Sequence, residues 1–140
     1  MSSPLTWASE SWPIFVLVCM FTGCAMHANV FDFSQMLATS KEPYVEFLRV
    51  PSMSVGMYVL DAGASDHQKP HSEDEVYYVA SGQAKMRTGS DGNARTFEVG
   101  PGTIIFVPAR LQHSFCEISE RLSVVVFFAP AEGSAAVAAQ

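Results

Sequence analysis

Residues 63–82, GASDHQKPHSEDEVYYVASG, place two histidines just before an acidic triplet that opens an apolar, aromatic run. The histidines are His67 and His71, and the triplet occupies positions 73–75. This concentration of groups has two interpretations. Either the groups form a polar turn at the end of a sheet, or some of them converge on a metal ion, because imidazole nitrogens and carboxylate oxygens are common metal ligands.

The composition suits one domain and restricts the classes of partner. The chain has 140 residues, of which 49% are hydrophobic, and this is enough for a compact core. The formal net charge of −6 argues against nucleic acid, because nucleic-acid-binding proteins carry a basic face. Cys19, Cys24 and Cys116 are too few and too scattered for a disulfide framework or a cysteine zinc site, so we expect a reducing compartment, the cytoplasm.

The first thirty residues form an N-terminal segment of uncertain role. Its run 13–28, PIFVLVCMFTGCAMHA, resembles the apolar part of a signal peptide, which makes export the alternative to a cytoplasmic location. A signal peptide needs a positive start, but the first basic residue is Lys41. The run is also shorter than the roughly 20 residues that span a bilayer, so we expect no stable membrane span. A true start at Met20 or Met26 fits the sequence better.

A short helix is predicted at 32–38, and strand patterns follow it. Eight short segments rich in Val, Ile, Tyr and Phe are separated by turn residues, which include Ser81-Gly82 and Ser119-Glu120. The predicted strands are 44–50, 54–60, 75–80, 83–88, 94–99, 103–107, 113–118 and 122–128. Many short strands with tight turns predict an all-β antiparallel sandwich or barrel over residues 31–130, and the small residues 131–140 predict a flexible tail.

Three residues are the candidate metal ligands. Glu75 begins one predicted strand, His71 lies just before it, and His113 begins another strand after a proline-bearing turn. If these strands are neighbours, two imidazoles and one carboxylate meet at one end of the barrel. That ligand set, with open positions, is typical of non-haem Fe(II) sites, and it also accepts Mn, Ni, Cu or Zn. We therefore expect one divalent metal ion, with Fe, Mn, Zn or Ni as the candidates.

Alternation along the strands extends this site. Tyr77 shares a face with Glu75, and Phe115 shares one with His113, so both are candidate walls of a substrate pocket. Cys116 alternates to the opposite face and is expected to be a buried small hydrophobe. Glu73 and Asp74 are expected to face water.

The spacing in residues 63–82 resembles the first conserved motif of the cupin superfamily. That motif runs Gly, five residues, His-x-His, three or four residues, Glu, six residues and Gly. Gly63, His71, Glu75 and Gly82 hold matching positions in this chain.

Residues 102–117 resemble the second cupin motif. It runs Gly, five residues, Pro-x-Gly, two residues, His, three residues and Asn. Gly102, Pro108 and His113 hold the matching positions. Together the two resemblances cover roughly residues 44–128.

The departures from the motifs concern the ligand set. Lys69 stands where the first motif has its first histidine, and an ammonium group has no lone pair for a metal. Three ligands remain, and a fourth comes from His67 or Gln68 if the chain bulges before His71. Lys69 is then free to face a substrate carboxylate from the pocket or to face water, and so is Arg110, which replaces a motif glycine. Glu117 replaces the motif Asn and lies outside the ligand set.

The resemblance implies a small single-domain cupin, a monocupin. Its fold is all-β, a double-stranded β-helix or jelly-roll barrel with a short N-terminal helix. A barrel of this kind is often dimeric, because edge strands pair across subunits, and we expect a homodimer. We expect a metal-dependent enzyme, dioxygenase-like or an isomerase or decarboxylase, acting on a small organic molecule. The alternative is a non-catalytic module that binds a small ligand or a metal. No individual catalytic residue is assigned.

Overall fold

A computed structural model of the chain describes residues 29–135. The apolar run 13–28, the alternative start positions and two of the three cysteines lie outside this range. The elements in chain order are α1 (Val30–Thr39), β1 (Tyr44–Val50), β2 (Met53–Leu60), β3 (Asp74–Thr88), the short 3-10 helix η1 (Asp91–Asn93), β4 (Arg95–Val99), β5 (Ile104–Val107) and β6 (His113–Ala129).

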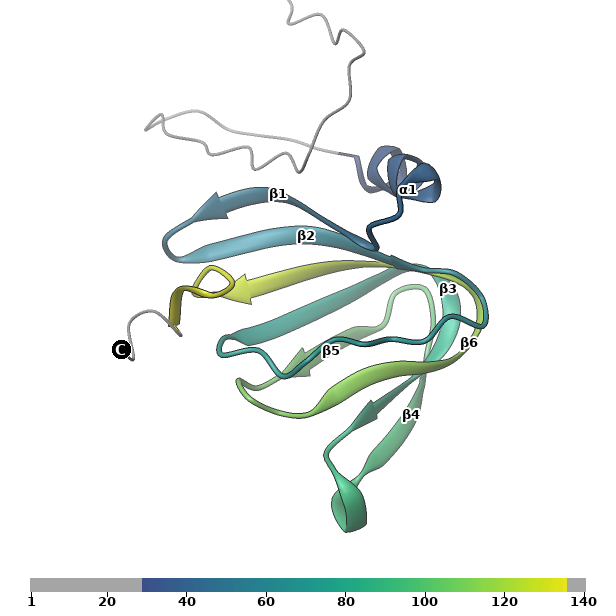
Figure 1. Cartoon of the computed structure of the whole chain (residues 1–140), viewed down its shortest axis with the longest axis vertical. Helices are drawn as coiled ribbons and strands as arrows, with labels where there is room; N and C mark the ends of the chain where they lie inside the picture. Colours follow the sequence, from purple (N-terminus) through teal and green to yellow (C-terminus); the bar gives the residue numbers. More distant parts are fainter. Residues whose placement is uncertain (1–28, 136–140) are drawn as a thin grey trace, which may run out of the picture.

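The helix α1 begins two residues earlier than predicted. Its N-cap is Asn29, whose side-chain oxygen accepts a hydrogen bond from the Phe31 amide at 2.9 Å. Asp32 then falls in the first turn, where a negative charge is favoured by the helix dipole. Leu37 is buried in an apolar cluster with side chains of β1 and β2, so the helix covers part of that sheet (Figure 1). No helix among residues 29–135 is long and apolar enough to cross a membrane.

The strands form one antiparallel sheet in the order β1-β2-β6-β3-β4, and β5 pairs with β3. This confirms the all-β class with one short N-terminal helix. Figure 1 shows that the sheet is strongly curved rather than flat. The two longest strands, β3 and β6, pair with each other from Asp74↔Ala129 at one end to Thr88↔His113 at the other.

Two predicted turns are wrong, because the chain continues through them as strand. Ser81-Gly82 lies inside β3, and Ser119-Glu120 lies inside β6. The register between these strands shifts around Ser81, and Gly82 and Glu117 have φ angles of 94° and 46°. Such bulges bend a strand without ending it. Six strands, two of them long and bent, therefore replace the eight short ones.

The core lies inside the curved sheet. Tyr77 and Phe115 are among its largest fully buried side chains, and their rings pack edge to face with centroids 5.3 Å apart. Cys116 alternates away from them as expected, but it is only half-buried, because that side of β6 is partly open to solvent.

The expected flexible tail begins with a packed segment, residues 131–135. Ala131 is buried, and the Ala135 amide donates to Glu73 Oε1 at 3.0 Å. The expectation that Glu73 faces water is wrong. The residue is only 2% exposed, and its carboxylate accepts hydrogen bonds from Ser72 Oγ and from this C-terminal backbone. Asp74 is exposed, as expected.

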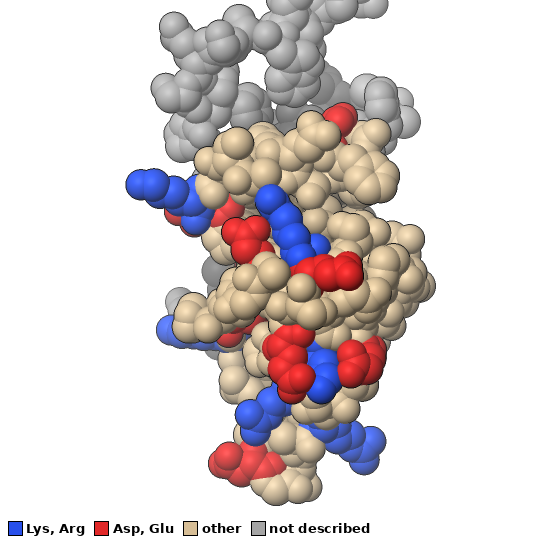
Figure 2. Space-filling model, turned by 90° about the vertical axis from the view of Figure 1, so that its right-hand side faces the viewer, with Lys and Arg blue, Asp and Glu red and all other residues tan. Residues whose placement is uncertain are grey.

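Charges of both signs are interspersed on the face shown in Figure 2. Some of the charges pair with each other. Lys85 Nζ lies 2.6 Å from Glu117 Oε2 and 3.7 Å from Glu98 Oε1. Exposed pairs of this kind contribute little to stability. The contact with Lys85 shows where the Glu117 side chain lies: it pairs with a lysine on the surface, apart from the candidate ligands.

We predict that Gly82→Ala destabilises the protein more than Gly63→Ala. Both glycines have left-handed φ angles, of +94° and +75°, so both substitutions carry a penalty of about 1–2 kcal/mol. A Cβ at Gly82 would also collide with the backbone oxygen of Arg121, whereas nothing lies within 4 Å of one at Gly63. Urea denaturation of the two variants measures the difference. Equal losses would show that the close approach of β3 and β6 at the bulge is unimportant.

Candidate metal centre

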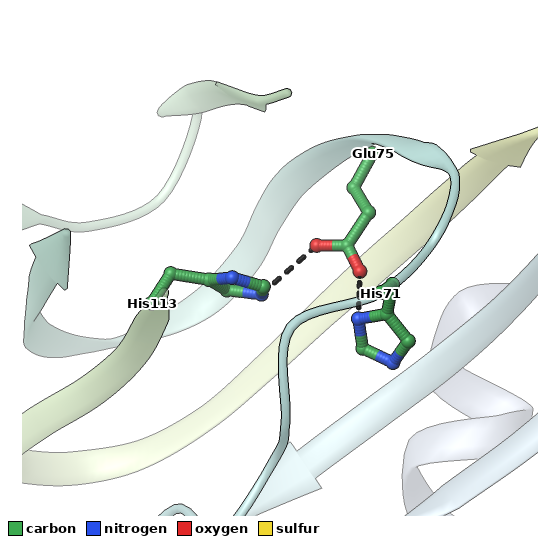
Figure 3. A group of neighbouring side chains, drawn as sticks. All are labelled: His71, Glu75 and His113. Atoms are coloured by element: carbon green, nitrogen blue, oxygen red, sulfur yellow. Dashed lines mark ion pairs between the residues drawn. The ribbon is translucent and has the colours of Figure 1, made fainter. Parts of the chain in front are cut away.

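Three side chains from separate parts of the barrel meet at one point inside it. His71 lies in the loop before β3, Glu75 is at the start of β3, and His113 is at the start of β6. Figure 3 shows the Glu75 carboxylate between the two imidazoles. One ligand atom from each residue can be chosen so that all three atoms lie within 4.8 Å of one another. The cluster is largely buried, with Glu75 and His113 each 1% exposed.

The curvature of the sheet creates this meeting point. His113 pairs with Thr88, at the opposite end of β3 from Glu75. Even so, His113 Nε2 lies 2.9 Å from Glu75 Oε2, because the bent strands bring the two ends of β3 to the same interior. Two hydrogen bonds then join the loop after β5 to the start of β3. The Arg110 amide donates to the His71 carbonyl at 2.7 Å, and the Ala109 amide donates to Asp74 Oδ1 at 2.8 Å.

The orientation of the His113 ring is set by a backbone carbonyl. His113 Nδ1 lies 2.8 Å from the Leu111 carbonyl oxygen, which can only accept, so Nδ1 carries a proton and donates it. The other nitrogen, Nε2, therefore faces Glu75. A hydrogen bond of this kind on the far side of the ring is how metal-binding histidines are held in one tautomer.

The contacts within the cluster are close, but they lack the geometry of hydrogen bonds. His71 Nδ1 contacts Glu75 Oε1, yet this nitrogen and both Glu75 oxygens are buried without a hydrogen-bond partner. Buried polar groups are normally paired, so three such atoms facing one another require an explanation. A cation placed among them would satisfy all three. The donor set, two imidazoles and one carboxylate, fits Fe, Mn, Ni or Zn.

The pKa values of the cluster reflect the same charge pairing. Burial lowers the pKa of His113, but the Glu75 carboxylate and the Leu111 carbonyl outweigh burial, and the pKa is raised above 6.5. The pKa of His71 is raised in the same way by Glu75 and Glu132, against the effect of burial. Burial raises the pKa of Glu75, but the two imidazoles lower it below 4.5.

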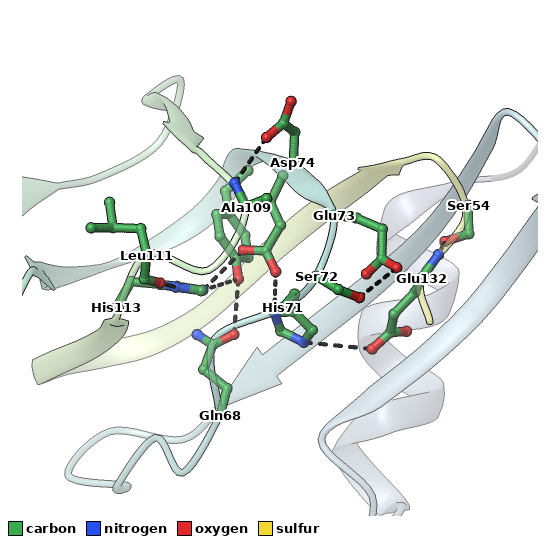
Figure 4. Close-up of polar contacts among 12 residues, drawn as sticks. Ser54, Gln68, His71, Ser72, Glu73, Asp74, Ala109, Leu111, His113 and Glu132 are labelled. Atoms are coloured by element: carbon green, nitrogen blue, oxygen red, sulfur yellow. Dashed lines mark hydrogen bonds and ion pairs between the residues drawn. The ribbon is translucent and has the colours of Figure 1, made fainter. Parts of the chain in front are cut away.

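A chain of hydrogen bonds supports His113 from the loop before the cluster (Figure 4). Gln68 Nε2 donates to Asp66 Oδ2 at 2.6 Å, so its Oε1 faces the Tyr77 hydroxyl, which donates to it at 2.8 Å. The same hydroxyl lies 3.1 Å from His113 Nε2. Asp66 is itself fixed by donors from the Tyr58 hydroxyl and the backbone amides of Gln68 and Phe115.

A cavity of about 190 Å³ adjoins the cluster, and His71 lines it. Most of its other walls are aromatic or aliphatic, namely Tyr44, Tyr58, Tyr77, Val126 and Phe128. The remaining polar walls are Gln68 and Glu132. An apolar pocket with a few converging polar groups is the usual form of a small-molecule site.

Glu132 lies on the cavity wall beside His71. Its Oε1 is 3.5 Å from His71 Nε2, the nitrogen that points away from Glu75. The Glu132 backbone is held at both ends, because its amide donates to Ser54 Oγ at 2.9 Å and its carbonyl accepts from Arg49 at 3.0 Å. Burial raises the pKa of the Glu132 carboxyl, although His71 opposes that shift.

The other residues expected at the site divide between the cavity wall and the surface. Gln68 is half-buried and lines the cavity, whereas His67 and Lys69, in the same loop before β3, are exposed and are absent from the cavity wall in the described chain. Phe115 lies behind Tyr77 rather than on the wall. Arg110 is exposed and has a φ of 67°. Glycine adopts this left-handed conformation most easily, which accounts for the glycine that the cupin motif has where this chain has Arg110.

Several residues of the site were missed from the sequence, namely Asp66, Glu132 and the cavity walls Tyr44, Tyr58, Val126 and Phe128. Asp66 precedes His67 in a polar loop, and no spacing rule distinguished it from the neighbouring acidic groups. Glu132 is the only charged residue among positions 129–140, and this was the one available indication. Its role depends on how the segment after β6 packs, which no local pattern encodes.

The fold and the cluster define a class: a small antiparallel β-barrel with a two-histidine, one-glutamate group inside it. A family model for the cupin domain matches residues 56–128, which include all three candidate ligands. The chain therefore belongs to the cupin family.

Individual relatives agree with this assignment. The chain is 47% identical over 95 residues to an uncharacterized protein of Streptomyces coelicolor, covering 68% of this chain and 87% of that one. It is 34% identical over 64 residues to an acireductone dioxygenase of Rhodopseudomonas palustris, covering 45% of this chain but only 39% of the dioxygenase. A solved structure from Bacillus halodurans has a TM-score of 0.62 at 18% identity, covering 77% of this chain and 83% of that one, a likeness of fold alone.

We predict that metal reverses the pH dependence of stability. The raised pKa values of His71 and His113 contribute stability below about pH 6.5, and this is lost as the pH rises through their folded values. The lowered pKa of Glu75 contributes stability above about pH 4.5, lost as the pH falls through its folded value. Metal-free protein should therefore lose stability as the pH rises above about 6.5, through the raised folded pKa values of the two imidazoles.

Metal-loaded protein should not lose stability over this range, because a metal competes with protons for the same nitrogens and binds better as the protons leave. Urea denaturation with a chelator and with added zinc at each pH provides the comparison. Parallel pH profiles in the two conditions would contradict a metal bound through these imidazoles.

Proposed function

We propose that the protein is a metal-dependent cupin enzyme that acts on a small organic molecule by dioxygenase-like chemistry. The observation that carries this proposal is the His71–Glu75–His113 cluster beside a cavity that a small molecule can enter. The 34% identity to part of an acireductone dioxygenase supports oxygen-dependent chemistry, and oxalate decarboxylase structures up to 30% identical to this chain keep a decarboxylase as the alternative. A bound Fe or Mn ion would supply Lewis acidity and redox chemistry toward dioxygen.

The chain's own residues have separate tasks in this proposal. His71, Glu75 and His113 hold the ion, and the Leu111 carbonyl keeps His113 Nδ1 protonated so that Nε2 is directed inward. Gln68 is a better candidate than His67 for a fourth ligand, because its side-chain oxygen lies next to the Tyr77 hydroxyl beside His113. The apolar walls of the cavity exclude water from a bound substrate.

A non-catalytic binding module is the second candidate, and Lys69 favours it. The first motif histidine is replaced by a lysine that points outward, so the family's usual site has lost one ligand. A site with fewer ligands suits weaker or altered metal binding. The two candidates differ in one measurable property: the metal-loaded enzyme would consume oxygen with a substrate, whereas the binding module would not.

We predict that His71→Ala and His113→Ala lose the metal, while His67→Ala keeps it. His67 is the matched control, because it lies four positions from His71 but is exposed and outside the cluster. Elemental analysis of untagged protein measures the metal, with about one ion per chain expected in wild type. Circular dichroism of each variant separates loss of metal from loss of fold.

The outcomes distinguish the candidate functions. Iron or manganese in wild type, together with oxygen consumption in the presence of small organic compounds, supports the dioxygenase-like enzyme. Stoichiometric metal without oxygen consumption supports the binding module or a non-redox enzyme. Folded wild type that holds no metal, even after anaerobic reconstitution, contradicts both metal-based candidates.

We also propose that the protein forms a homodimer through an apolar outer face of the sheet. This face consists of Ile104 and Phe106 on β5, Tyr78 on β3 and Phe127 on β6, all of which are exposed. They form a continuous patch, because Tyr78 pairs with Ile104, and both Phe106 and Phe127 pair with Val76. A second copy of the chain offers the same apolar face, so a two-fold contact would cover both.

We predict that Phe106→Asp converts a dimer to a monomer at micromolar concentration. The substitution places a charge in the centre of the apolar contact, where it would be desolvated. Phe31→Asp is the control, because Phe31 on α1 is 62% exposed and Phe106 is 61% exposed. Sedimentation equilibrium measures the mass. A monomeric wild type, or a dimer that both variants retain, would contradict this interface.

A further inference from the structure

The cavity beside the candidate metal centre has the size of a single ring. Its volume is about 190 Å³, and a cavity of ~150 Å³ accommodates benzene. Three tyrosines and Phe128 line it, and flat aromatic walls suit a planar ligand. The Phe128 ring also packs edge-on against His71, with centroids 4.9 Å apart, so this wall continues to the candidate ligands.

The described wall of the cavity lacks the positive side chains that a binding site for anions normally has. No Lys or Arg is among the described residues that line it. Lys69 and Arg110, the two cations for which either a substrate carboxylate or water was left open, are both exposed. The nearby Arg49 is already engaged, because its guanidinium binds both carboxylate oxygens of Glu46 at 2.7 and 2.8 Å and the Glu132 carbonyl at 3.0 Å. An anionic substrate would therefore meet no side-chain cation dedicated to it.

Glu132 places a carboxylate, rather than a cation, on the cavity wall. Its backbone is anchored by Ser54 and Arg49, and the segment that carries it is fastened further along by the buried carboxylate of Glu73. The Glu132 side chain is left to line the cavity, 3.5 Å from His71. Among residues 29–135, this long contact is the one side-chain ion pair of its carboxylate, so its oxygens retain the capacity to accept hydrogen bonds from a ligand.

We propose that the cavity takes a ring-sized, non-anionic molecule that donates a hydrogen bond to Glu132 from a hydroxyl or amino group. A neighbouring oxygen or nitrogen of the same molecule faces the His71–Glu75–His113 cluster. This inference rests on the proposed metal site and adds the substrate class to it. Glu132 acts as a specificity residue, because its carboxylate attracts a donor and repels a carboxylate at the same position.

Catechol and salicylate test this class, because they share a ring with two adjacent oxygen-bearing substituents and differ in the carboxylate. The protein is loaded with zinc, which is redox-inert, so catechol is bound without being oxidised. Dissociation constants of both compounds are measured by titration calorimetry for wild type, Glu132→Gln and Glu98→Gln. Glu98 is the charge-matched control, because it is 79% exposed on β4 and does not line the cavity.

Wild type should bind catechol at least about tenfold more tightly than salicylate. The repulsion between the carboxylates of Glu132 and salicylate in a partly buried cavity weakens binding by about this factor. Glu132→Gln should reduce that ratio at least about fivefold by weakening catechol and strengthening salicylate, again from the loss of one charge. Glu98→Gln should leave the ratio unchanged. The ratio is taken within each variant, so a general loss of affinity cancels.

Three results would overturn the inference. Salicylate bound as tightly as catechol by zinc-loaded wild type would show that the cavity accepts anions, and this result needs no variant. An unchanged ratio in folded, zinc-loaded Glu132→Gln would show that Glu132 does not select the ligand. Wild type that takes up no zinc would overturn the proposed metal site together with this inference, and elemental analysis of the same samples separates that case from the other two.

Discussion

The pairing of β3 with β6 is the constraint on which the rest of the structure depends. These two strands run beside each other from Asp74↔Ala129 to Thr88↔His113, and bulges around Ser81 and Gly82 bend them together. Without the bend, the two ends of β3 would lie far apart and Glu75 could not approach His113. With it, the sheet encloses Tyr77 and Phe115 and brings Glu75 and His113, two of the three cluster residues, to one interior point. Fold and site therefore share one cause.

The His71–Glu75–His113 cluster combines a carboxylate with two imidazoles because a buried charge needs partners. A carboxylate as deeply buried as Glu75 is unfavourable unless it is paired, and here both of its oxygens face imidazole nitrogens. Protons on the imidazoles stabilise this arrangement at moderately low pH, and a divalent cation would do so once those protons are lost. The network from Asp66 through Gln68 and Tyr77 limits the movement of His113, which keeps its nitrogen directed at the same point.

The C-terminal segment changes the character of the cavity. Residues 131–135 pack against the barrel through Ala131 and the buried Glu73, and they bring Glu132 to the wall beside His71. A second carboxylate near a metal site offsets the charge of the ion and makes the cavity less attractive to anions. Under the proposed substrate class, this short stretch after the last strand would influence which small molecules the barrel accepts.

The sequence by itself determined the all-β class, the family and the candidate ligands, because strand alternation and the spacing of His71, Glu75 and His113 are local properties of the chain. It also indicated that Lys69 cannot be a metal ligand as an ammonium ion. Only the tertiary structure decided that Ser81-Gly82 is a bulge, that Glu73 is buried, that Lys69 lies outside the cavity and that Glu132 lines it. Each of these depends on contacts between segments distant in the chain, and a local pattern contains no information about which segments will meet.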